Sequence, residues 1–188
     1  MTSIDLQIHS SLQSSIDPSS AIEDANNGIG KDDERWRMLW HEPMQGEHLA
    51  SIRLLVEKLK PQCENILLLG IGGSALGTKA LHTALGSDGP RLFVLDNIDP
   101  HTVQTTIDTI MLDDPTLEYT VVTVISKSGE TAEITSLLMV VEQAMGEATF
   151  VAITGPSGTL RQYASKKKWA TLTVPDGVGG RFSVLSPV

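Results

Sequence analysis

Residues 66–77 read Ile-Leu-Leu-Leu-Gly-Ile-Gly-Gly-Ser-Ala-Leu-Gly. Four consecutive apolar residues are typical of a strand buried on both faces of a parallel sheet, and the glycines after them allow a sharp turn into a helix. Four more short apolar runs follow, at 92–95, 121–125, 150–153 and 171–174. Stretches with helical apolar spacing separate them, at 75–85, 102–110, 131–145 and 157–168. This alternation predicts an α/β fold, a five-stranded parallel sheet with helices on both faces in a flavodoxin-like strand order.

The chain before the first strand is expected to consist of an N-terminal arm up to residue 46 and a helix after it. A helix is expected over 47–60, where apolar residues recur at helical spacing and Pro61 ends the pattern. Residues 1–33 are rich in Ser, Asp and Asn without a sustained apolar period, and a short helix is expected over 33–41. We therefore expect an N-terminal arm at 1–46, partly disordered or helical, and one domain at 47–188.

Length and composition limit the class of protein. With 188 residues, 40% hydrophobic and 20% charged, the chain suits one soluble globular domain. A net charge of −9 argues against nucleic acid as a partner. The apolar runs are too short to cross a membrane, and the N-terminus lacks a signal-peptide pattern. The single cysteine, Cys63, cannot form an internal disulfide, which fits a reducing, cytoplasmic location.

The glycine-rich loop after the first strand has several interpretations. Residues 70–75 satisfy the G-x-G-x-x-[GA] pattern of dinucleotide sites, and Asp96 ends the next strand, where a ribose-binding acid would lie. A P-loop is disfavoured, because Thr78-Lys79 reverses the order that a P-loop requires. A monophosphate site with a contribution from Ser74, and a tight turn that binds nothing, are also compatible. The loop alone leaves these alternatives open.

A second loop follows the third strand and reads Ser126-Lys127-Ser128-Gly129-Glu130-Thr131. Its three hydroxyls and one ammonium, next to backbone N–H groups at a helix start, suit a phosphate dianion. An ordinary helix N-cap at Ser128 is the structural alternative. In a flavodoxin-like sheet the first and third strands are neighbours, so the two loops should face one crevice beyond the carboxyl ends of the strands. This placement favours a phosphate monoester over a dinucleotide.

A third stretch, residues 178–188, reads Val-Gly-Gly-Arg-Phe-Ser-Val-Leu-Ser-Pro-Val. Together with Ile71-Gly72-Gly73-Ser74 and residues 126–131, it resembles three motifs of the glucose-6-phosphate isomerases, in the family's order, within the SIS (sugar isomerase) domain superfamily. The resemblance implies that residues 47–188 form a SIS phosphosugar-binding domain that ends before the family's second SIS domain. It also implies an aldose–ketose isomerase of glycolysis and gluconeogenesis that interconverts glucose 6-phosphate and fructose 6-phosphate. Such an enzyme needs no cofactor, and the full-length protein would be a homodimer.

The resemblance also implies roles for individual residues. The substrate phosphate would be held by four residues of the second loop: Ser126, Lys127, Ser128 and Thr131. The sugar would contact residues of the first and third motifs: Gly73, Ser74 and Gly180. Arg181 would be the catalytic residue, stabilising an enediolate intermediate by its charge.

The same resemblance sets a limit on activity. The family's base is a glutamate and its ring-opening group is a histidine, with a lysine contributing, and these lie downstream of the third motif. None has a counterpart here, so the chain alone is expected to be inactive or nearly so. Two other functions stay open: a non-catalytic phosphosugar-sensing SIS module, and an NAD-dependent dehydrogenase using the Gly70–Ala75 loop. The histidines lack paired metal-ligand spacing, so no metal site is expected.

Overall fold

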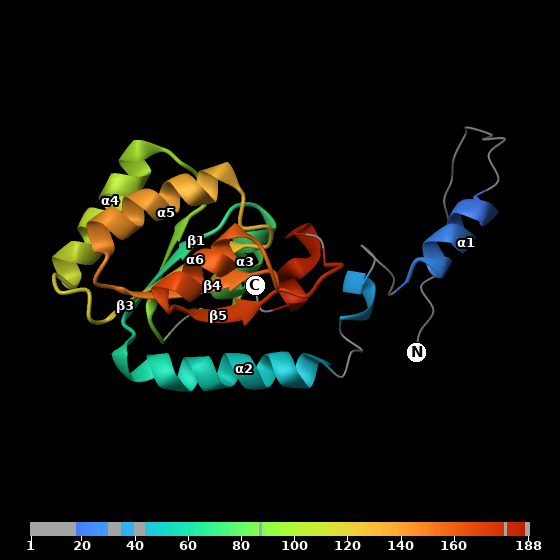
Figure 1. Cartoon of the computed structure of the whole chain (residues 1–188), viewed down its shortest axis with the longest axis horizontal. Coiled ribbons are helices and arrows are strands. Elements are labelled where there is room, and N and C mark those ends of the chain that lie inside the picture. The colour runs from blue at the N-terminus through green and yellow to red at the C-terminus, as the bar shows by residue number, and fades with distance from the viewer. Residues whose placement is uncertain (1–17, 30–34, 40–43, 87, 179, 187–188) are drawn as a thin grey trace.

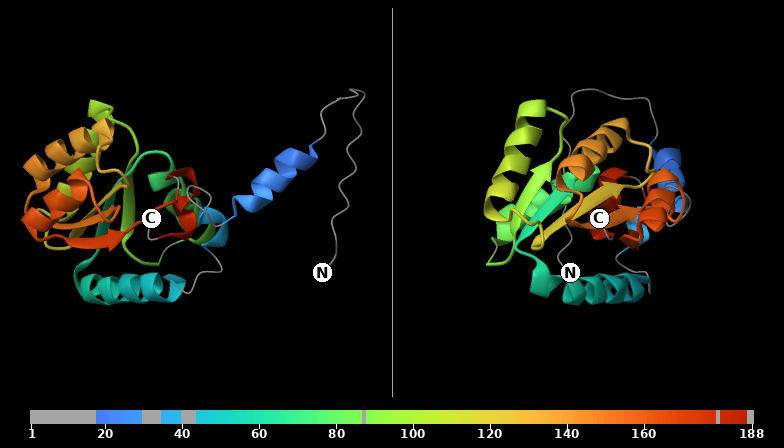
Figure 2. Two further views of the ribbon diagram at one scale, coloured as in Figure 1. Left: turned by 45° about the vertical axis from the view of Figure 1, so that its right-hand side comes forward. Right: turned by 60° about the vertical axis from the view of Figure 1, so that its left-hand side comes forward.

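The computed structural model describes residues 18–29, 35–39, 44–86, 88–178 and 180–186 (Figure 1). Two short elements come first, α1 (Ser19–Asn27) and the 3₁₀ helix η1 (Arg35–Met38). Helix α1 stands apart from the sheet in two views and buries none of its residues (Figures 1 and 2). The described part of the N-terminal arm thus has a helix at 19–27, where none was expected, and a 3₁₀ helix at 35–38, inside the range 33–41 where a short helix was expected. Residues 1–17 and most of the residues between α1 and η1 lie outside the described part.

The sheet has five parallel strands: β1 (Asn65–Leu69), β2 (Arg91–Leu95), β3 (Thr120–Ser126), β4 (Thr149–Thr154) and β5 (Ala170–Thr173). Their order is β2-β1-β3-β4-β5, and each neighbouring pair is parallel. The order reverses between β1 and β3, as in a flavodoxin-like fold. The predicted fold class is confirmed, including the neighbouring placement of the first and third strands.

Helices cover both faces of this sheet. The larger core cluster joins one face to α4 (Pro100–Asp113), α5 (Ala132–Met145) and α6 (Thr159–Lys167). The smaller cluster joins the other face to α2 (Met44–Leu59) and α3 (Gly73–Leu85). Figure 1 shows α4 and α5 on one side of the strands and α2 on the other. Two 3₁₀ helices complete the fold: η2 (Lys60–Gln62) after α2, and η3 (Gly180–Leu185) at the C-terminal end.

Local signals explain several helix boundaries. The Asp99 carboxylate accepts a hydrogen bond from the backbone N–H of Thr102 at 2.8 Å, and Pro100 occupies the first turn of α4. Hydrogen bonds from the Thr102 hydroxyl and N–H lower the pKa of Asp99. Pro61 follows α2 and lies within η2, so the chain tightens into a 3₁₀ turn before β1. Among the described helices, none is both long enough and apolar enough to cross a membrane.

Candidate functional site

The first loop leads from β1 into α3 without a side-chain cap. Gly72 precedes the helix with φ 59° and ψ −121°, a conformation that favours glycine. A Cβ atom at Gly72 would meet no atom within 4 Å, so the space before the helix is open. The predicted sugar contacts Gly73 and Ser74 form the first turn of α3 and are half-buried. The loop therefore presents backbone groups and one hydroxyl at the carboxyl end of β1.

The second loop presents two hydroxyls at the start of α5. Ser126, 4% exposed, ends β3, and its Oγ accepts a hydrogen bond from the N–H of Gly129 at 3.1 Å. The same Oγ lies 3.3 Å from Oγ1 of Thr131. Thr131 is the N-cap residue of α5, but its side chain makes no capping hydrogen bond. The N-cap at Ser128 that we considered is therefore wrong: its Oγ accepts from the N–H of Glu130 at 3.2 Å, and the helix starts later.

Because no side chain caps the start of α5, backbone N–H groups there are available to bind an anion. The first N–H groups of a helix lack intrahelical partners and carry partial positive charge. At α5 they lie beside the hydroxyls of Ser126 and Thr131, which are free to turn their protons toward an anion. Lys127 is half-buried, and no ion pair is described for its ammonium within the described residues. The arrangement can bind a small dianion through hydroxyls, backbone donors and the helix dipole.

Close backbone contacts hold this loop against the segment between β4 and α6. Gly129 has φ 72°, and a Cβ there would lie 2.5 Å from the backbone nitrogen of Leu160. Gly158 has φ 108°, and its Cβ would lie 2.6 Å from the carbonyl oxygen of Ser128. The carbonyl oxygen of Lys127 accepts from the N–H of Gly155 at 3.0 Å. The sequence analysis did not identify the two glycines after β4, because they belong to no phosphate motif.

Arg161 is a second residue that the sequence analysis missed. From the first turn of α6 its guanidinium donates to the carbonyl oxygens of Thr154, Gly155 and Leu172 and to the hydroxyls of Thr171 and Thr173, at 2.6–3.3 Å. It thereby satisfies acceptors at the carboxyl ends of β4 and β5 and fixes the loop that supports residues 126–131. A lone arginine early in a helix carries no recognisable sequence signal, so only the structure reveals this role.

The third motif packs on the helix that follows the first loop. Ser183 lies in η3 and is 1% exposed. Its hydroxyl donates to the carbonyl oxygen of Gly180 at 2.6 Å and lies 3.5 Å from the carbonyl oxygen of Gly73. A Cβ at Gly77 would lie 2.6 Å from Cγ2 of Val184, so α3 and η3 are in close contact and a larger residue at position 77 would displace Val184. Gly180 is exposed. The structure thus brings the first and third motifs into contact.

One predicted site residue has no described side chain. The backbone of Arg181 belongs to η3, but its side chain lies outside the described part of the structure. The catalytic role of Arg181 therefore stays a prediction. Among the described residues, no group of three or more His, Cys, Asp or Glu side chains is arranged to hold a metal ion.

Lys79 and Asp96, on which the P-loop and dinucleotide interpretations depend, pair with each other. Nζ of Lys79 lies 2.7 Å from Oδ2 of Asp96. Lys79 is therefore held by a carboxylate just after β2, the strand that pairs with β1. Asp96, which a dinucleotide site would use for a ribose, already has a cation as partner. The ion pair favours neither the P-loop nor the dinucleotide interpretation.

Comparison with known proteins identifies a family that this chain matches. The family model described as "Phosphoglucose isomerase" matches residues 56–188. A curated protein of Haloquadratum walsbyi, "Probable glucose-6-phosphate isomerase", is 45% identical over 130 residues. That match covers 65% of this chain and 29% of the relative, so the chain spans less than a third of the relative's length.

Two solved structures resemble this chain over most of its length. A hypothetical protein of Thermus thermophilus has a TM-score of 0.77 at 33% identity, covering 90% of this chain and 42% of that chain. A glucose-6-phosphate isomerase from Chlamydia trachomatis has a TM-score of 0.61 at 26% identity, covering 97% of this chain and 31% of that chain. More distant phosphosugar isomerases, at 18% identity, share the fold alone.

Proposed function

This chain belongs to the phosphoglucose isomerase family, and we propose that it forms the phosphosugar-binding part of an enzyme that interconverts glucose 6-phosphate and fructose 6-phosphate. The observation that carries the proposal is the start of α5, where the hydroxyls of Ser126 and Thr131 lie 3.3 Å apart beside a helix N-terminus without a side-chain cap. A phosphate monoester is the anion that such a set of donors suits.

We assign the individual roles from the resemblance of the three motifs, and this placement supports them. Ser128, Thr131 and Ser126 donate hydroxyl protons to the phosphate, and Lys127 adds positive charge or its backbone N–H. Gly73 and Ser74, across the strand reversal from the second loop, line the sugar. Gly180 and Arg181 approach the reacting carbons from η3, which contacts the first turn of α3. Arg181 then stabilises the enediolate by its charge.

Proton transfer is the step for which none of the residues assigned above supplies a group. Isomerisation needs a base next to the carbonyl carbon, and each missing acid or base costs about 10²–10⁴-fold in rate. We expect phosphosugar binding to be weak and turnover to be close to zero in the chain alone. In the full-length enzyme we propose a cytoplasmic homodimer whose remaining residues complete the site.

The test is calorimetric titration of the chain with fructose 6-phosphate. Thr131→Val removes one hydroxyl without removing a cap, since the Thr131 side chain caps nothing. A hydrogen bond to a charged group contributes about 1.5–3 kcal/mol, so the affinity should fall by at least about tenfold. Ser128→Ala should weaken binding in the same direction.

Thr135→Val is the matched control. Its hydroxyl donates to the carbonyl oxygen of Thr131 one turn along α5 and faces solvent. The control should bind within twofold of the unaltered chain. Equal affinity of the unaltered chain and Thr131→Val would overturn the phosphate site. Heat from NAD with none from fructose 6-phosphate would show that the Gly70–Ala75 loop is a dinucleotide site instead.

A further inference from the structure

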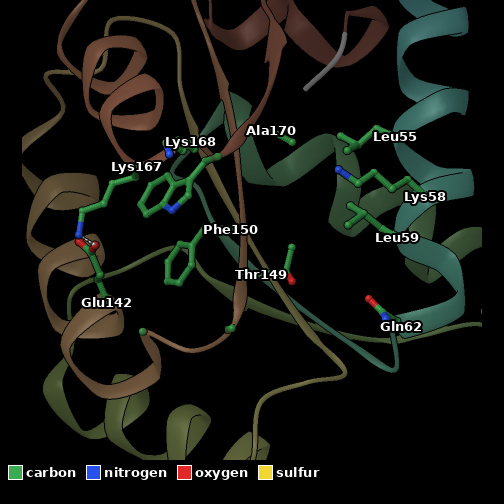
Figure 3. A pocket seen from close by; sticks show the side chains of 13 residues that line it. Leu55, Lys58, Leu59, Gln62, Glu142, Thr149, Phe150, Lys167, Lys168 and Ala170 are labelled. Atoms are coloured by element: carbon green, nitrogen blue, oxygen red, sulfur yellow. Dashed lines mark ion pairs between the residues drawn. The ribbon is translucent and has the colours of Figure 1, made fainter.

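A cavity lies at the edge of the sheet opposite the loops described above. It has a volume of about 530 Å³, and it lies between α2 and the starts of β4 and β5 (Figure 3). Four segments far apart in the chain line it: the end of α2 with Gln62, the end of α5, the start of β4, and the turn from α6 into β5. Since β4 rises about 3.3 Å per residue, the cavity and the phosphate loop are separated by about 16 Å of strand.

The charge of the lining is positive, although the whole chain carries −9. Its charged members are three lysines and one glutamate: Lys58, Lys167, Lys168 and Glu142. Oε1 of Glu142 lies 2.5 Å from Nζ of Lys167, and its other oxygen accepts from the Tyr163 hydroxyl at 2.6 Å. Partial burial alone would raise the pKa of Glu142, but the hydrogen bonds from Lys167 and Tyr163 outweigh it and lower the pKa. The negative charge of Glu142 is therefore already balanced by Lys167.

The other two lysines are available to a ligand. No ion pair within the described residues engages Lys58 or Lys168. Figure 3 shows the Lys58 side chain reaching from α2 toward the cavity, with Leu59 between it and Gln62, and Lys168 on the opposite side of the cavity. Lys168 has φ 60° and ψ 30°, the left-handed conformation that usually selects glycine at a helix end. A lysine there costs about 1–2 kcal/mol of backbone energy, so the chain keeps an ammonium where glycine would be more stable.

The remaining wall is apolar and aromatic. Trp169 and Phe150 stack with ring centroids 4.6 Å apart and 14° between their planes. Tyr163 meets Trp169 edge-on at 5.5 Å, so the indole is held between two rings. Leu55 and Leu59 of α2 line the cavity as well. The apolar wall is thus already in place before any ligand binds.

We propose that this cavity binds a small organic phosphate with a planar aromatic group, of the nucleoside monophosphate class. Lys58 and Lys168 bind the phosphate, Gln62 and Thr149 add hydrogen bonds, and the apolar wall receives the planar group. Lysine acts as a point charge and suits a tetrahedral phosphate, whereas planar carboxylates favour the arginine fork, and no arginine is among the described residues that line the cavity. A volume of this size is typical of ligand pockets.

Calorimetric titration with AMP tests the proposal, with inorganic phosphate and adenosine as separate probes. AMP should bind more tightly than either probe. The double variant Lys58→Gln with Lys168→Gln should lose at least tenfold in AMP affinity. The control is Lys60→Gln with Lys166→Gln, which removes the same charge from neighbouring positions that do not line the cavity. The control should bind AMP within twofold of the unaltered chain.

The other outcomes each overturn the proposal. Inorganic phosphate binding as tightly as AMP would mean an adventitious ion only, and adenosine doing so would exclude a phosphate subsite. An equal loss in both double variants would indicate general charge attraction.

The indole N–H signal of Trp169, identified by Trp169→Phe, should shift with AMP in nuclear magnetic resonance spectra. The two sites share no residue, so fructose 6-phosphate affinity should be unchanged in both double variants, whichever way the phosphosugar proposal is decided.

Discussion

At the scale of single residues, the second loop depends on positions where a side chain cannot fit. Gly129 and Gly158 both have positive φ, and each touches backbone atoms of the segment opposite. Their contacts hold the backbone of residues 126–131 close to the loop between β4 and α6. The hydroxyls that we assign to the phosphate thus owe their position to glycines outside the loop as well as inside it.

Gly158→Ala tests this dependence. The substitution brings a Cβ within 2.6 Å of the Ser128 carbonyl oxygen at φ 108°. Strain of this kind costs about 1–3 kcal/mol, so urea unfolding should show a loss of that size in the free energy of unfolding. The variant should also weaken fructose 6-phosphate binding, because the Ser128 backbone must move.

Gly46→Ala is the matched control for that measurement. Gly46 lies within α2, and a Cβ there would meet nothing within 4 Å. Alanine in a helix is more stable than glycine by about 0.5–1 kcal/mol, so this variant should be stabilised. Equal stability of Gly158→Ala and the unaltered chain would contradict the packing argument.

At the scale of elements, the N-terminal arm is attached to the third motif. The rings of Trp36 in η1 and Phe182 in η3 stack with centroids 3.9 Å apart and 8° between their planes. Arg35 adds a hydrogen bond from Nη1 to the carbonyl oxygen of Asp176 at 3.4 Å. Leu39, just after η1, is 3% exposed. Since η3 carries Gly180 and Arg181, η1 supports the segment assigned to the reacting carbons.

Trp36→Ala should therefore loosen η3 and leave the sheet unchanged. An aromatic stack contributes about 0.5–1.5 kcal/mol beyond its buried area. The amide N–H of Ser186, which donates to the carbonyl oxygen of Ser183 at 2.8 Å, should exchange with solvent several-fold faster. Amides of β3 should keep their rates.

Ile22→Ala in α1 is the control for hydrogen exchange. Its side chain is 57% exposed and belongs to a helix with no buried residue. Exchange in η3 should be the same in this variant as in the unaltered chain. Unchanged exchange of Ser186 in Trp36→Ala would show that the stack does not stabilise η3.

The helices and strands also show how much of the secondary structure the sequence predicted. All five strands and the four helices that follow them were expected within about three residues of their observed ends, because runs of apolar residues report burial directly. The start of α5 was expected at residue 131 and is observed at Ala132, although Ser128 and Thr131 are both acceptable cap residues in a sequence. In the structure the Ser126 hydroxyl accepts a hydrogen bond from the N–H of Gly129, residues 127–129 form a bend, and the helix begins only after Thr131.

At the scale of the whole molecule, the two faces of the sheet are not covered equally. An apolar groove of about 390 Å³ remains between α2 and the sheet, lined by Leu55, Val56 and Leu172 among others. On α3, three leucines are largely exposed: Leu76 (61%), Leu81 (54%) and Leu85 (80%). Exposed apolar surface of this extent favours association.

We expect the chain to self-associate as its concentration rises. Sedimentation velocity over a range of concentrations should show a weight-average mass that increases with concentration. Leu81→Glu with Leu85→Glu should reduce that increase, because charge on the α3 face opposes its burial. Leu112→Glu is the control, since Leu112 is 83% exposed on α4, which covers the other face of the sheet. A clean monomer at high concentration would contradict the prediction.

The amino-acid sequence by itself determined the alternation of strands and helices, the strand reversal beside the first loop and the family of this protein. These features depend on local apolar periodicity and on motifs of four to eleven contiguous residues. The tertiary structure alone decided which groups meet across the chain: Arg161 with the ends of β4 and β5, Lys79 with Asp96, and Trp36 with Phe182. It also decided which lysines line the cavity at the opposite edge of the sheet. The physical reason is that these contacts join residues separated by up to about 150 positions, and no local pattern of hydrophobicity encodes which distant polar or aromatic groups the packed sheet brings together.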